Sequence, residues 1–486
     1  MKKTIFISTA IPYVNSKPHL GHALEYVQAD AYVRAQALLE EDMFFLTGTD
    51  DNALKNVHAA EAAGKPVKEY VQENAERFID LDERLAVKYN DFIRTSVDER
   101  HRKGVEKLWL STKPEDLYKK SYKGFYCVGC EEFKTEKELI NGECHEHPGT
   151  MLEEIEEENY FFRLSTYQDK IEKLIETDEI RIIPESRKRE ALSFVRGGLE
   201  DFSVSRSALR AKGWGIPVPN DPEQYLYVWY DALANYITAL GYADDSEEYK
   251  KFWVNADERL HIIGKGINRF HTMYWPAMLL SAGVALPTTI FIHGYITSEG
   301  QKMSKSIGNV IDPNDLLDKY GTDAIRYLLL RHVHPTEDTD ITWERLDEWY
   351  LANLVNGLGN LVARVMKLAE GNLDAAVELT TEDTAVDAVF MDHVNNFRFN
   401  EALNYIFEMI ADSDMLMTER APFKKVKSED ADMVQEGKGD ITILVRNLAT
   451  IAAHLAPAMP ATSKAILAAV VSNTKPENLF PRIEVA

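Results

Sequence analysis

Residues 5–30 read IFISTAIPYVNSKPHLGHALEYVQAD, and this stretch decides how the rest of the chain is organised. Its first apolar run predicts a buried strand, and the prolines and polar residues between positions 12 and 18 predict a loop. Apolar residues then recur at helical spacing from Leu20 onward. The stretch therefore predicts a strand, a loop and a helix in succession, with His19, Gly21 and His22 where the helix begins.

The start of this helix is a candidate phosphate site. A helix N-terminus presents backbone N–H groups and the positive end of the helix dipole, and both favour phosphate. The imidazoles of His19 and His22 can donate hydrogen bonds to a polyphosphate, and Gly21 allows the backbone to come close to it. Four residues alone are equally well explained by a capped helix with two solvated histidines, so both interpretations stay open here.

A second candidate phosphate motif lies in the polar stretch SEGQKMSKSIGN, residues 298–309, where Lys302 and Lys305 accompany Ser304 and Ser306. Lysine can neutralise the charge that develops on a phosphoryl group as a bond to it breaks. Taken alone, this stretch is also typical of a solvated turn. The two motifs together, in this order and at this separation, are far more specific than either one.

Composition excludes several classes of protein. The chain has 486 residues, for which we expect roughly two to four domains. Its net charge of −24 argues against a surface that coats nucleic acid and against binding to anionic membranes, although a local basic patch remains compatible. No apolar stretch has membrane-spanning length. All three cysteines lie between positions 127 and 144, which argues against a disulfide framework and predicts a cytoplasmic location.

The order of strand and helix patterns predicts an α/β protein. Residues 1–115 alternate between the two, with short strands expected at 43–46 and 91–94, which favours a Rossmann-type parallel sheet with crossover helices. The predicted domains are the first half of this catalytic domain (1–115), a connective insert (116–222), the second half (223–294), a loop and linker region holding the second motif (295–342), and an α-helical bundle (343–486).

The insert contains a candidate zinc site. Cys127 and Cys130 form a C-x2-C pair, and Cys144 and His147 repeat this spacing, so the four side chains can surround one tetrahedral Zn²⁺ in a zinc knuckle. His145 is the alternative fourth ligand, and three unligated thiols are the alternative to a metal site. A site with four protein ligands is structural, because no position remains for a reacting water.

Other residues suggest a binding pocket next to the sheet. Asp50 directly follows the second predicted strand, where ligands of such sheets bind, and its carboxylate could hold an ammonium group or simply cap a turn. One face of a later helix, at spacings i, i+3, i+4 and i+7, carries Trp229, Ala232, Leu233 and Tyr236. Such a stripe is the wall of a pocket or ordinary core packing. His271 lies in the predicted helix over residues 268–280, where a buried structural histidine is the simplest interpretation.

The C-terminal part reads as a helical bundle from residue 343 onward. Leucines at alternating steps of three and four residues predict a core-facing stripe. Asn356, Asn360 and Arg364 recur at i, i+4 and i+8 on a neighbouring face. These side chain types are either solvated or able to read the edges of bases.

The two phosphate motifs resemble the signatures of class I aminoacyl-tRNA synthetases, and over nearly its whole length the chain resembles the methionyl-tRNA synthetase family. Further stretches that carry this resemblance are the sequence AIPY at residues 10–13, the cysteine cluster, YVW at 227–229, Phe270 with His271, WPA at 275–277, and Asn360 with Arg364. The insert is too short for the editing domain of the isoleucine, valine and leucine enzymes. The cysteine-specific relative has its zinc ligands in the active site instead of an inserted knuckle.

The resemblance implies activation of L-methionine with Mg²⁺-ATP to methionyl-adenylate, release of pyrophosphate, and transfer of the methionyl group to the 3′ end of tRNA(Met). It implies that ATP is bound at Gly21 and that the α-phosphate is stabilised by His19, His22, Lys302 and Lys305. The implied methionine pocket consists of Ile11, Tyr13, Asp50, Trp229, Ala232, Leu233, Tyr236 and His271. The residues implied to face the CAU anticodon are Asn356, Asn360, Arg364 and Phe423. Some members carry a C-terminal dimerisation domain without a counterpart here, so a monomer is expected.

The chain departs from the family pattern at several positions. Residues 50–53 read DDNA where the family usually has Asp-Glu-His-Gly, and Gly266 stands where an aspartate is common. Leu233 replaces a common proline, and Phe423 replaces a common tryptophan, whose ring is larger. Asp50 itself is retained, so the expected ammonium site is intact.

Two other functions are compatible with parts of this pattern. A synthetase-like tRNA-binding protein without catalysis would explain the departures at Asp51 and Gly266, but it would not need both phosphate motifs. A nucleotidyltransferase that shares the sheet would activate a different acid, but it would need neither the helical bundle nor the zinc knuckle.

Overall fold

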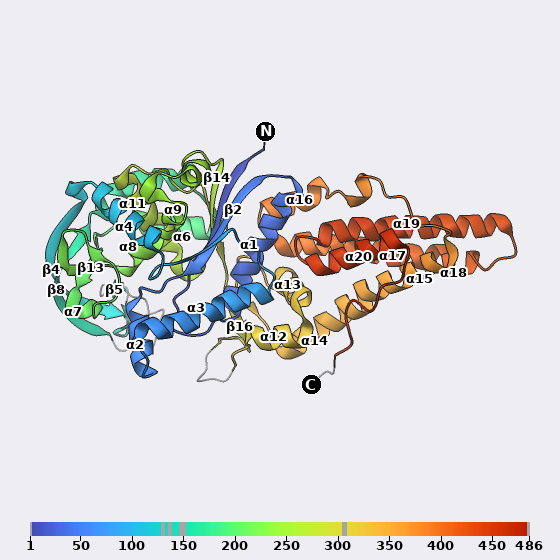
Figure 1. The fold of residues 1–486 in the computed structure, drawn as a ribbon, viewed down its shortest axis with the longest axis horizontal. Helices are drawn as coiled ribbons and strands as arrows, with labels where there is room; N and C mark the ends of the chain where they lie inside the picture. Colours follow the sequence, from blue (N-terminus) through green and yellow to red (C-terminus); the bar gives the residue numbers. More distant parts are fainter. Residues whose placement is uncertain (1, 128–131, 135–138, 145–151, 304–308, 484–486) are drawn as a thin grey trace. The chain divides into compact units, whose positions relative to one another are not determined.

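The computed structural model of the protein describes all of the chain except residues 1, 128–131, 135–138, 145–151, 304–308 and 484–486. Two compact units are formed, and each is built from three separate segments (Figure 1). Unit 1 comprises Met1–Pro18, Glu41–Asp80 and Lys88–His293, and unit 2 comprises His19–Glu40, Leu81–Val87 and Gly294–Ala486. The chain thus passes from one unit to the other inside the loop that follows its first strand.

Unit 1 is built around a six-stranded sheet in the order β3-β2-β1-β14-β15-β9, in which all neighbouring strands are parallel. These strands are β1 (Thr4–Thr9), β2 (Asp42–Thr49), β3 (Asp91–Arg94), β9 (Arg181–Ile183), β14 (Glu258–Gly264) and β15 (Thr289–His293). The apolar residues of β1 and β14 are almost completely buried, because helices cover both faces of a parallel sheet. The predicted Rossmann-type sheet is therefore confirmed, with the expected strands at 43–46 and 91–94 present as β2 and β3.

One strand of this sheet was not expected. β9 lies within residues 116–222, the segment predicted to interrupt the sheet, and pairs with β15 at the edge. The rest of this segment forms a four-stranded antiparallel sheet of β4 (Leu117–Cys127), β5 (Glu132–Lys134), β8 (Glu153–Phe162) and β10 (Phe202–Ser203). It also forms a smaller sheet of β11 (Ser205–Ser207), β12 (Pro217–Val218) and β13 (Asp221–Leu226), together with helices α5 (Gln168–Glu176), α6 (Glu185–Arg196) and α7 (Ala208–Ala211).

Further helices of unit 1 are α2 (Leu54–Ala62), most of α3 (Val67–Arg84), α4 (Glu99–Ser111), α8 (Val228–Leu233), α9 (Asn235–Thr238) and α11 (Trp275–Ala282). Of these, α8 and α9 carry four of the eight residues of the predicted methionine pocket. The helix predicted over residues 268–280 is present, but it begins with a π-helical turn, η7 (Phe270–Tyr274), before α11.

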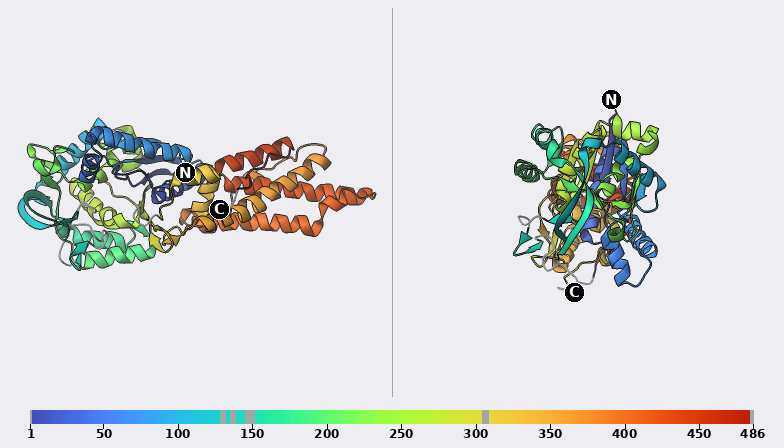
Figure 2. Two further views of the ribbon diagram at one scale, coloured as in Figure 1. Left: turned by 90° about the horizontal axis from the view of Figure 1, so that it is seen from below. Right: turned by 90° about the vertical axis from the view of Figure 1, so that its left-hand side faces the viewer.

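Unit 2 is mostly helical. Its helices are α1 (Leu20–Leu38), α12 (Pro313–Tyr320), α13 (Thr322–Arg331), α14 (Trp343–Trp349), the π-helical η8 (Tyr350–Gly359), α15 (Asn360–Asn372), α16 (Ala388–Asn395), α17 (Phe399–Arg420), α18 (Pro422–Lys425), α19 (Ala431–Leu455) and α20 (Pro460–Ser472). Helix α19 packs against α17 and α20, drawn in orange and red in Figure 2. The predicted leucine stripe is confirmed, since Leu354, Leu358 and Leu361 are buried. No helix in the described part of the chain is long and apolar enough to cross a membrane.

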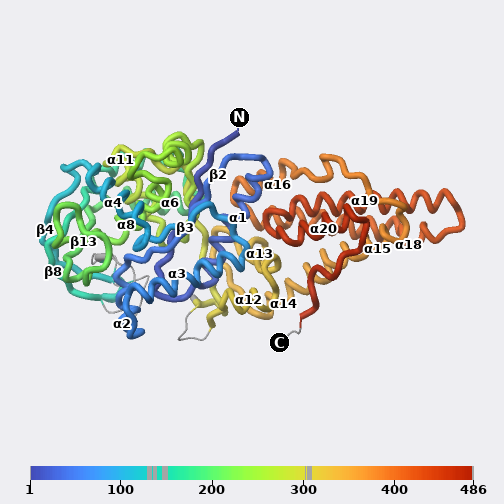
Figure 3. Tube along the Cα trace, in the orientation of Figure 1, coloured from blue at the N-terminus to red at the C-terminus, as the bar shows by residue number. Residues whose placement is uncertain are grey.

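A buried arginine joins the three segments of unit 2. Arg326 on α13 is completely buried, and its Nη2 lies 2.6 Å from Oδ2 of Asp30 on α1. Its guanidinium also donates hydrogen bonds to the carbonyl groups of Leu85 (3.0 Å), Pro457 (2.9 Å) and Ala458 (2.7 Å). A buried cation is tolerated only when it is paired and hydrogen-bonded, so this set of partners fixes α1 against α13, which contact each other in the trace of Figure 3.

Candidate active site

The predicted methionine pocket lies in unit 1, beyond the carboxyl ends of β1 and β2. The backbone N–H of Asp50 donates a hydrogen bond to the carbonyl of Pro12 (2.8 Å), and Tyr13 and Asp50 form a parallel bridge. This extension of the two strands places Tyr13 beside Asp50, and the neighbouring Ile11 packs against the apolar core. The structure thus brings together the residues predicted from the first loop and from the second strand.

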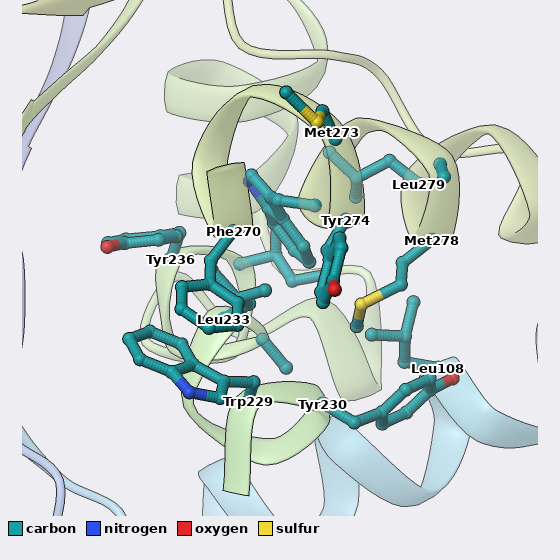
Figure 4. Packing of buried hydrophobic residues seen from close by; sticks show 14 of the residues in the cluster. Leu108, Trp229, Tyr230, Leu233, Tyr236, Phe270, Met273, Tyr274, Met278 and Leu279 are labelled. Carbon is teal, nitrogen blue, oxygen red and sulfur yellow. The ribbon is translucent and has the colours of Figure 1, made fainter. Parts of the chain in front are cut away.

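Aromatic rings pack against one another among the residues of the predicted pocket. Trp229 on α8 stacks face to face on Phe270 of η7, with ring centroids 3.8 Å apart and planes 8° apart (Figure 4). Tyr13 meets Trp229 edge-on, with centroids 6.1 Å apart. Ala232 and Leu233 are buried on the same helix as Trp229. Phe270 was not predicted as a site residue, although its position directly before His271 was a signal that could have suggested it.

The predicted residues Tyr236 and His271 contact each other directly. Nδ1 of His271 lies 3.0 Å from the carbonyl of Ile267, so this nitrogen carries the proton and donates it. Nε2 therefore accepts the hydrogen bond from the Tyr236 hydroxyl, 2.7 Å away. Complete burial lowers the pKa of His271 to about 4, so the ring is neutral near pH 7 and fixes the direction of the tyrosine hydroxyl.

Two neighbouring buried carboxylates have different environments. Asp51 accepts hydrogen bonds from Arg94 (2.8 Å) and Ser96 (2.7 Å) through one oxygen, and from Thr49 through the other. Burial raises the pKa of Asp51, and Arg94 opposes this shift. Asp51 is thus a structural ion-pair partner, whereas Asp50, which is only 2% exposed, lies beside Tyr13 at the pocket.

The first phosphate motif begins helix α1 in unit 2, as predicted. Nδ1 of His19 accepts a hydrogen bond from the backbone N–H of Gly21 (3.1 Å), and Nδ1 of His22 accepts one from the N–H of His19 (3.2 Å). The two imidazole rings stack with centroids 3.7 Å apart. This is a reciprocal capping box in which two histidines occupy the positions usually held by hydroxyl and carboxylate side chains.

The cap determines which ring nitrogens act as donors. Because both Nδ1 atoms accept hydrogen bonds from the backbone, a neutral ring at either position carries its proton on Nε2. Each ring therefore presents an N–H group on the side away from the helix backbone. Two such donors beside a helix N-terminus are suited to an oligophosphate.

Gly21 makes room for this arrangement. A Cβ atom at this position would lie 3.0 Å from Cε1 of His19. We therefore predict that Gly21→Ala displaces the His19 ring and lowers kcat of ATP–pyrophosphate exchange by about tenfold. Exchange kinetics measure this effect, and Gly371→Ala, at a helical position where a Cβ meets no atom within 4 Å, is the control. Unchanged kcat in Gly21→Ala would contradict the assigned role of this glycine.

The second phosphate motif is described only in part. Lys302 ends strand β17 (Gln301–Lys302), whose backbone pairs with β16 (Ile296–Ser298) at Thr297. Lys305 lies outside the described residues. The roles of these two lysines therefore stay predictions.

A sequence profile of the family described as tRNA synthetases class I (M) matches residues 5–366, which contain both phosphate motifs and the whole predicted pocket. The chain belongs to this family. The methionine–tRNA ligase of Caldanaerobacter subterraneus subsp. tengcongensis is 40% identical over 481 residues, covering 96% of this chain and 73% of that relative. The methionine–tRNA ligase of Nostoc sp. is 38% identical over 484 residues, with coverage of 96% and 89%.

Solved structures of this synthetase family agree with the fold. Mycobacterium tuberculosis methionyl-tRNA synthetase in complex with methionyl-adenylate superposes with a TM-score of 0.88 at 37% identity, covering 96% of this chain and 93% of that structure. The apo form of the same enzyme gives a TM-score of 0.83 at 33% identity. The resemblance inferred from the two motifs is thereby confirmed.

The zinc ligands predicted for this class I synthetase are only partly described. Cys127 ends β4, Cys144 ends β7 (Glu143–Cys144), and both thiols are buried. Cys130, His145 and His147 lie outside the described residues. Within the described ranges, no group of three or more metal-binding side chains is found. Buried sulfur at both described positions fits a thiolate metal site, and the identity of the complete ligand set stays a prediction.

The four predicted anticodon residues of the synthetase lie in unit 2. Asn356 on η8 and Asn360 at the start of α15 are exposed, whereas the neighbouring leucines of the stripe are buried. Arg364 lies 2.6 Å from Asp414 on α17, which holds its guanidinium at the helix surface. Phe423 on α18 is 37% exposed, so part of its side chain is accessible to solvent.

One cavity of unit 1 is lined by residues other than those of the predicted methionine pocket. It has a volume of about 940 Å³ and is lined by aromatic side chains from β4 and β8 and by arginines, among them Arg206, Arg210 and Arg269. None of the eight predicted methionine residues lines it. The predicted methionine residues are instead connected by direct contacts, among them Tyr13 with Asp50, Tyr13 with Trp229 and Tyr236 with His271.

Proposed function

We propose that the protein is a methionine–tRNA ligase that forms methionyl-adenylate from L-methionine and ATP and then charges tRNA(Met). The observation that carries this proposal is the pocket in which Asp50 lies beside Tyr13 and the stacked pair of Trp229 and Phe270. A carboxylate next to an apolar aromatic wall suits a ligand with an ammonium group and an uncharged side chain. The similarity of the chain to methionine–tRNA ligases supports methionine as that ligand.

Recognition of methionine follows from the chemistry of the pocket. Asp50 pairs with the ammonium group, and the rings of Trp229 and Phe270 contact the thioether, for which sulfur–aromatic contacts are favourable. Ile11, Ala232 and Leu233 complete the apolar surface. Tyr236, whose hydroxyl is held by His271, closes the end of the pocket.

Adenylate formation needs positioning and charge stabilisation without a side-chain nucleophile. A carboxylate oxygen of methionine attacks the α-phosphorus of ATP, and the bond to the bridging oxygen of pyrophosphate breaks. His19 and His22 donate from Nε2 to the phosphate oxygens, and Lys302 and Lys305 neutralise the negative charge that develops there. Mg²⁺ enters with ATP. A ribose hydroxyl at the 3′ end of the tRNA then attacks the carbonyl carbon, and AMP leaves.

Amino-acid-dependent ATP–pyrophosphate exchange tests this function. The purified protein is assayed with methionine and, separately, with leucine, isoleucine, valine and cysteine. We expect exchange with methionine alone. Exchange with another amino acid would show that the substrate is assigned wrongly, and folded protein without exchange would favour a tRNA-binding role.

The second substrate, tRNA(Met), is proposed to contact the helical bundle (residues 343–486) through Asn356, Asn360, Arg364 and Phe423. The amide and guanidinium groups read base edges, and the exposed ring of Phe423 stacks on a base of the CAU anticodon. We predict that Phe423→Ala raises KM for tRNA(Met) by about tenfold, since one base–aromatic stack contributes about 1–3 kcal/mol. Aminoacylation kinetics measure this change, and pyrophosphate exchange, which needs no tRNA, is the internal control that stays unchanged.

We also propose that the connective insert (residues 116–222) holds one structural Zn²⁺ through Cys127, Cys130, Cys144 and His147, with His145 as the alternative fourth ligand. The burial of Cys127 and Cys144 supports this site, because thiolate ligands are usually shielded from solvent. We predict about one zinc per chain and its loss in Cys144→Ser. Elemental analysis measures both the zinc content and its loss. The variants His145→Ala and His147→Ala identify the fourth ligand. Folded, active protein without metal would contradict the proposal.

We further propose that the enzyme acts as a monomer in the cytoplasm.

A further inference from the structure

A chain of buried polar side chains lies directly behind the methionine pocket of unit 1. The side-chain amide of Asn52 donates from Nδ2 to Oδ2 of Asp231 (2.7 Å). The other oxygen of Asp231, Oδ1, lies 2.6 Å from Nε2 of His101 on α4. Nδ1 of His101 lies 2.7 Å from the hydroxyl of Thr238 on α9. No function assigned so far uses Asn52, Asp231 or His101.

The chemistry of these groups fixes the direction of the network. A carboxylate only accepts hydrogen bonds, so Nε2 of His101 carries a proton and donates it to Asp231. Asp231 is 1% exposed and His101 is completely buried. A carboxylate at this depth needs donors at both of its oxygens, and His101 and Asn52 supply them. Nδ2 of Asn52 also donates a hydrogen bond to the carbonyl of Thr95 (3.2 Å), so both N–H groups of this amide have acceptors.

The network joins two parts of the pocket that are far apart in the sequence. Asn52 belongs to the turn that carries Asp50, and its backbone N–H donates to Oδ1 of Asp50 (3.1 Å). Asp231 belongs to α8, the helix that carries Trp229. The Asn52–Asp231 hydrogen bond therefore connects the group proposed to hold the methionine ammonium with the helix that forms the aromatic wall.

We propose that Asn52 and Asp231 are positioning residues that set the distance between the Asp50 carboxylate and the wall formed by α8, and that they thereby determine which amino acid fits. His101 holds Asp231 in place from behind. This inference rests on the proposed methionine–tRNA ligase activity. A pocket whose two ends are fixed to each other selects a side chain by its length, because ammonium and side chain must be satisfied at the same time.

The decisive variant is Asn52→Leu, which keeps the size of the side chain and removes its donor. We expect KM for methionine in pyrophosphate exchange to rise about tenfold or more, because a hydrogen bond to a charged group is lost, while KM for ATP changes less than about twofold. We also expect the preference for methionine over leucine to fall. Asn52→His, which can still donate an N–H group to Asp231, should restore part of the loss. The matched control is Asn74→Leu. Asn74 is another buried asparagine of unit 1, and its side-chain oxygen accepts a hydrogen bond from Arg77.

A double-mutant cycle separates positioning from general destabilisation. If Asn52 acts through Asp50, adding Asn52→Leu to Asp50→Ala should cause much less than the tenfold loss seen in the unaltered background. Equal losses in both backgrounds, or equal increases in KM for methionine and ATP, would overturn the inference. If the unaltered protein catalyses normal exchange and Asn52→Leu leaves KM for methionine unchanged, the inference is overturned while the proposed function stands. Absence of methionine-dependent exchange by the unaltered protein would overturn both together.

Discussion

Asp50→Ala lowers kcat/KM for methionine in pyrophosphate exchange by about 10²–10⁴-fold, because removing one partner of a buried ion pair costs about 3–5 kcal/mol. The carboxylate is 2% exposed and lies beside Tyr13, so water cannot replace it as the partner of the ammonium group. We expect most of the effect in KM for methionine. Steady-state kinetics with varied methionine and varied ATP measure it.

An analogue separates loss of the ion pair from damage to the pocket. The unaltered enzyme should bind methionine far more tightly than 4-(methylsulfanyl)butanoate, which lacks the amino group, and Asp50→Ala should lose this preference. Glu69→Ala, at an exposed carboxylate on α3, is the control and should behave as the unaltered protein. If Asp50→Ala still discriminated against the analogue, another group would have to bind the ammonium.

His22→Ala should lower kcat of exchange by about 10²–10³-fold, the usual cost of losing one donor to the charge of a transition state. The reason is the position of its proton: Nδ1 accepts a backbone hydrogen bond, so a neutral ring carries its proton on Nε2, the atom proposed to donate to a phosphate oxygen. KM for methionine should change little, because the imidazole is placed to act on the phosphate. Single-turnover formation of the adenylate measures the chemical step directly.

Loss of the helix cap must be separated from loss of catalysis in this variant. His22 closes the capping box of α1, so its removal also destabilises the helix by about 0.5–2 kcal/mol, which thermal unfolding measures. His22→Gln retains an N–H donor and should recover part of kcat. His58→Ala, at a partly exposed histidine on α2, serves as a control. If kcat in His22→Ala fell no further than in this control, the catalytic role of His22 would be wrong.

Local patterns in the sequence were sufficient for much of the fold and of the site. The apolar runs at residues 43–46 and 91–94 predicted β2 and β3, since a strand buried on both faces is apolar throughout. The spacing of Trp229, Ala232, Leu233 and Tyr236 predicted one helical face. All four residues are buried, but only the first three lie on α8, and Tyr236 lies on the next helix, α9. The two histidines predicted the start of α1, because a helix N-terminus has a local signal.

Contacts between distant residues had no such signal. β9 has only three residues, and its place at the sheet edge is set by β15, more than 100 positions later. Phe270, the first residue of the π-helical turn η7, stacks on Trp229, a contact between distant residues that the spacing of residues within either helix does not predict. Asn52 and Asp231 are 179 residues apart, and their hydrogen bond became visible only in three dimensions.

The Arg326 cluster limits how this enzyme can be divided or recombined. Residues 294–486 look like a separable module in the linear sequence, yet Arg326 pairs with Asp30 from one early segment and donates a hydrogen bond to the carbonyl of Leu85 from another. A fragment made of residues 294–486 would keep the arginine and lose both partners, leaving a buried cation only partly compensated. A chimaera that joins residues 294–486 to a different catalytic domain would therefore need to include α1 and residues 81–87 as well.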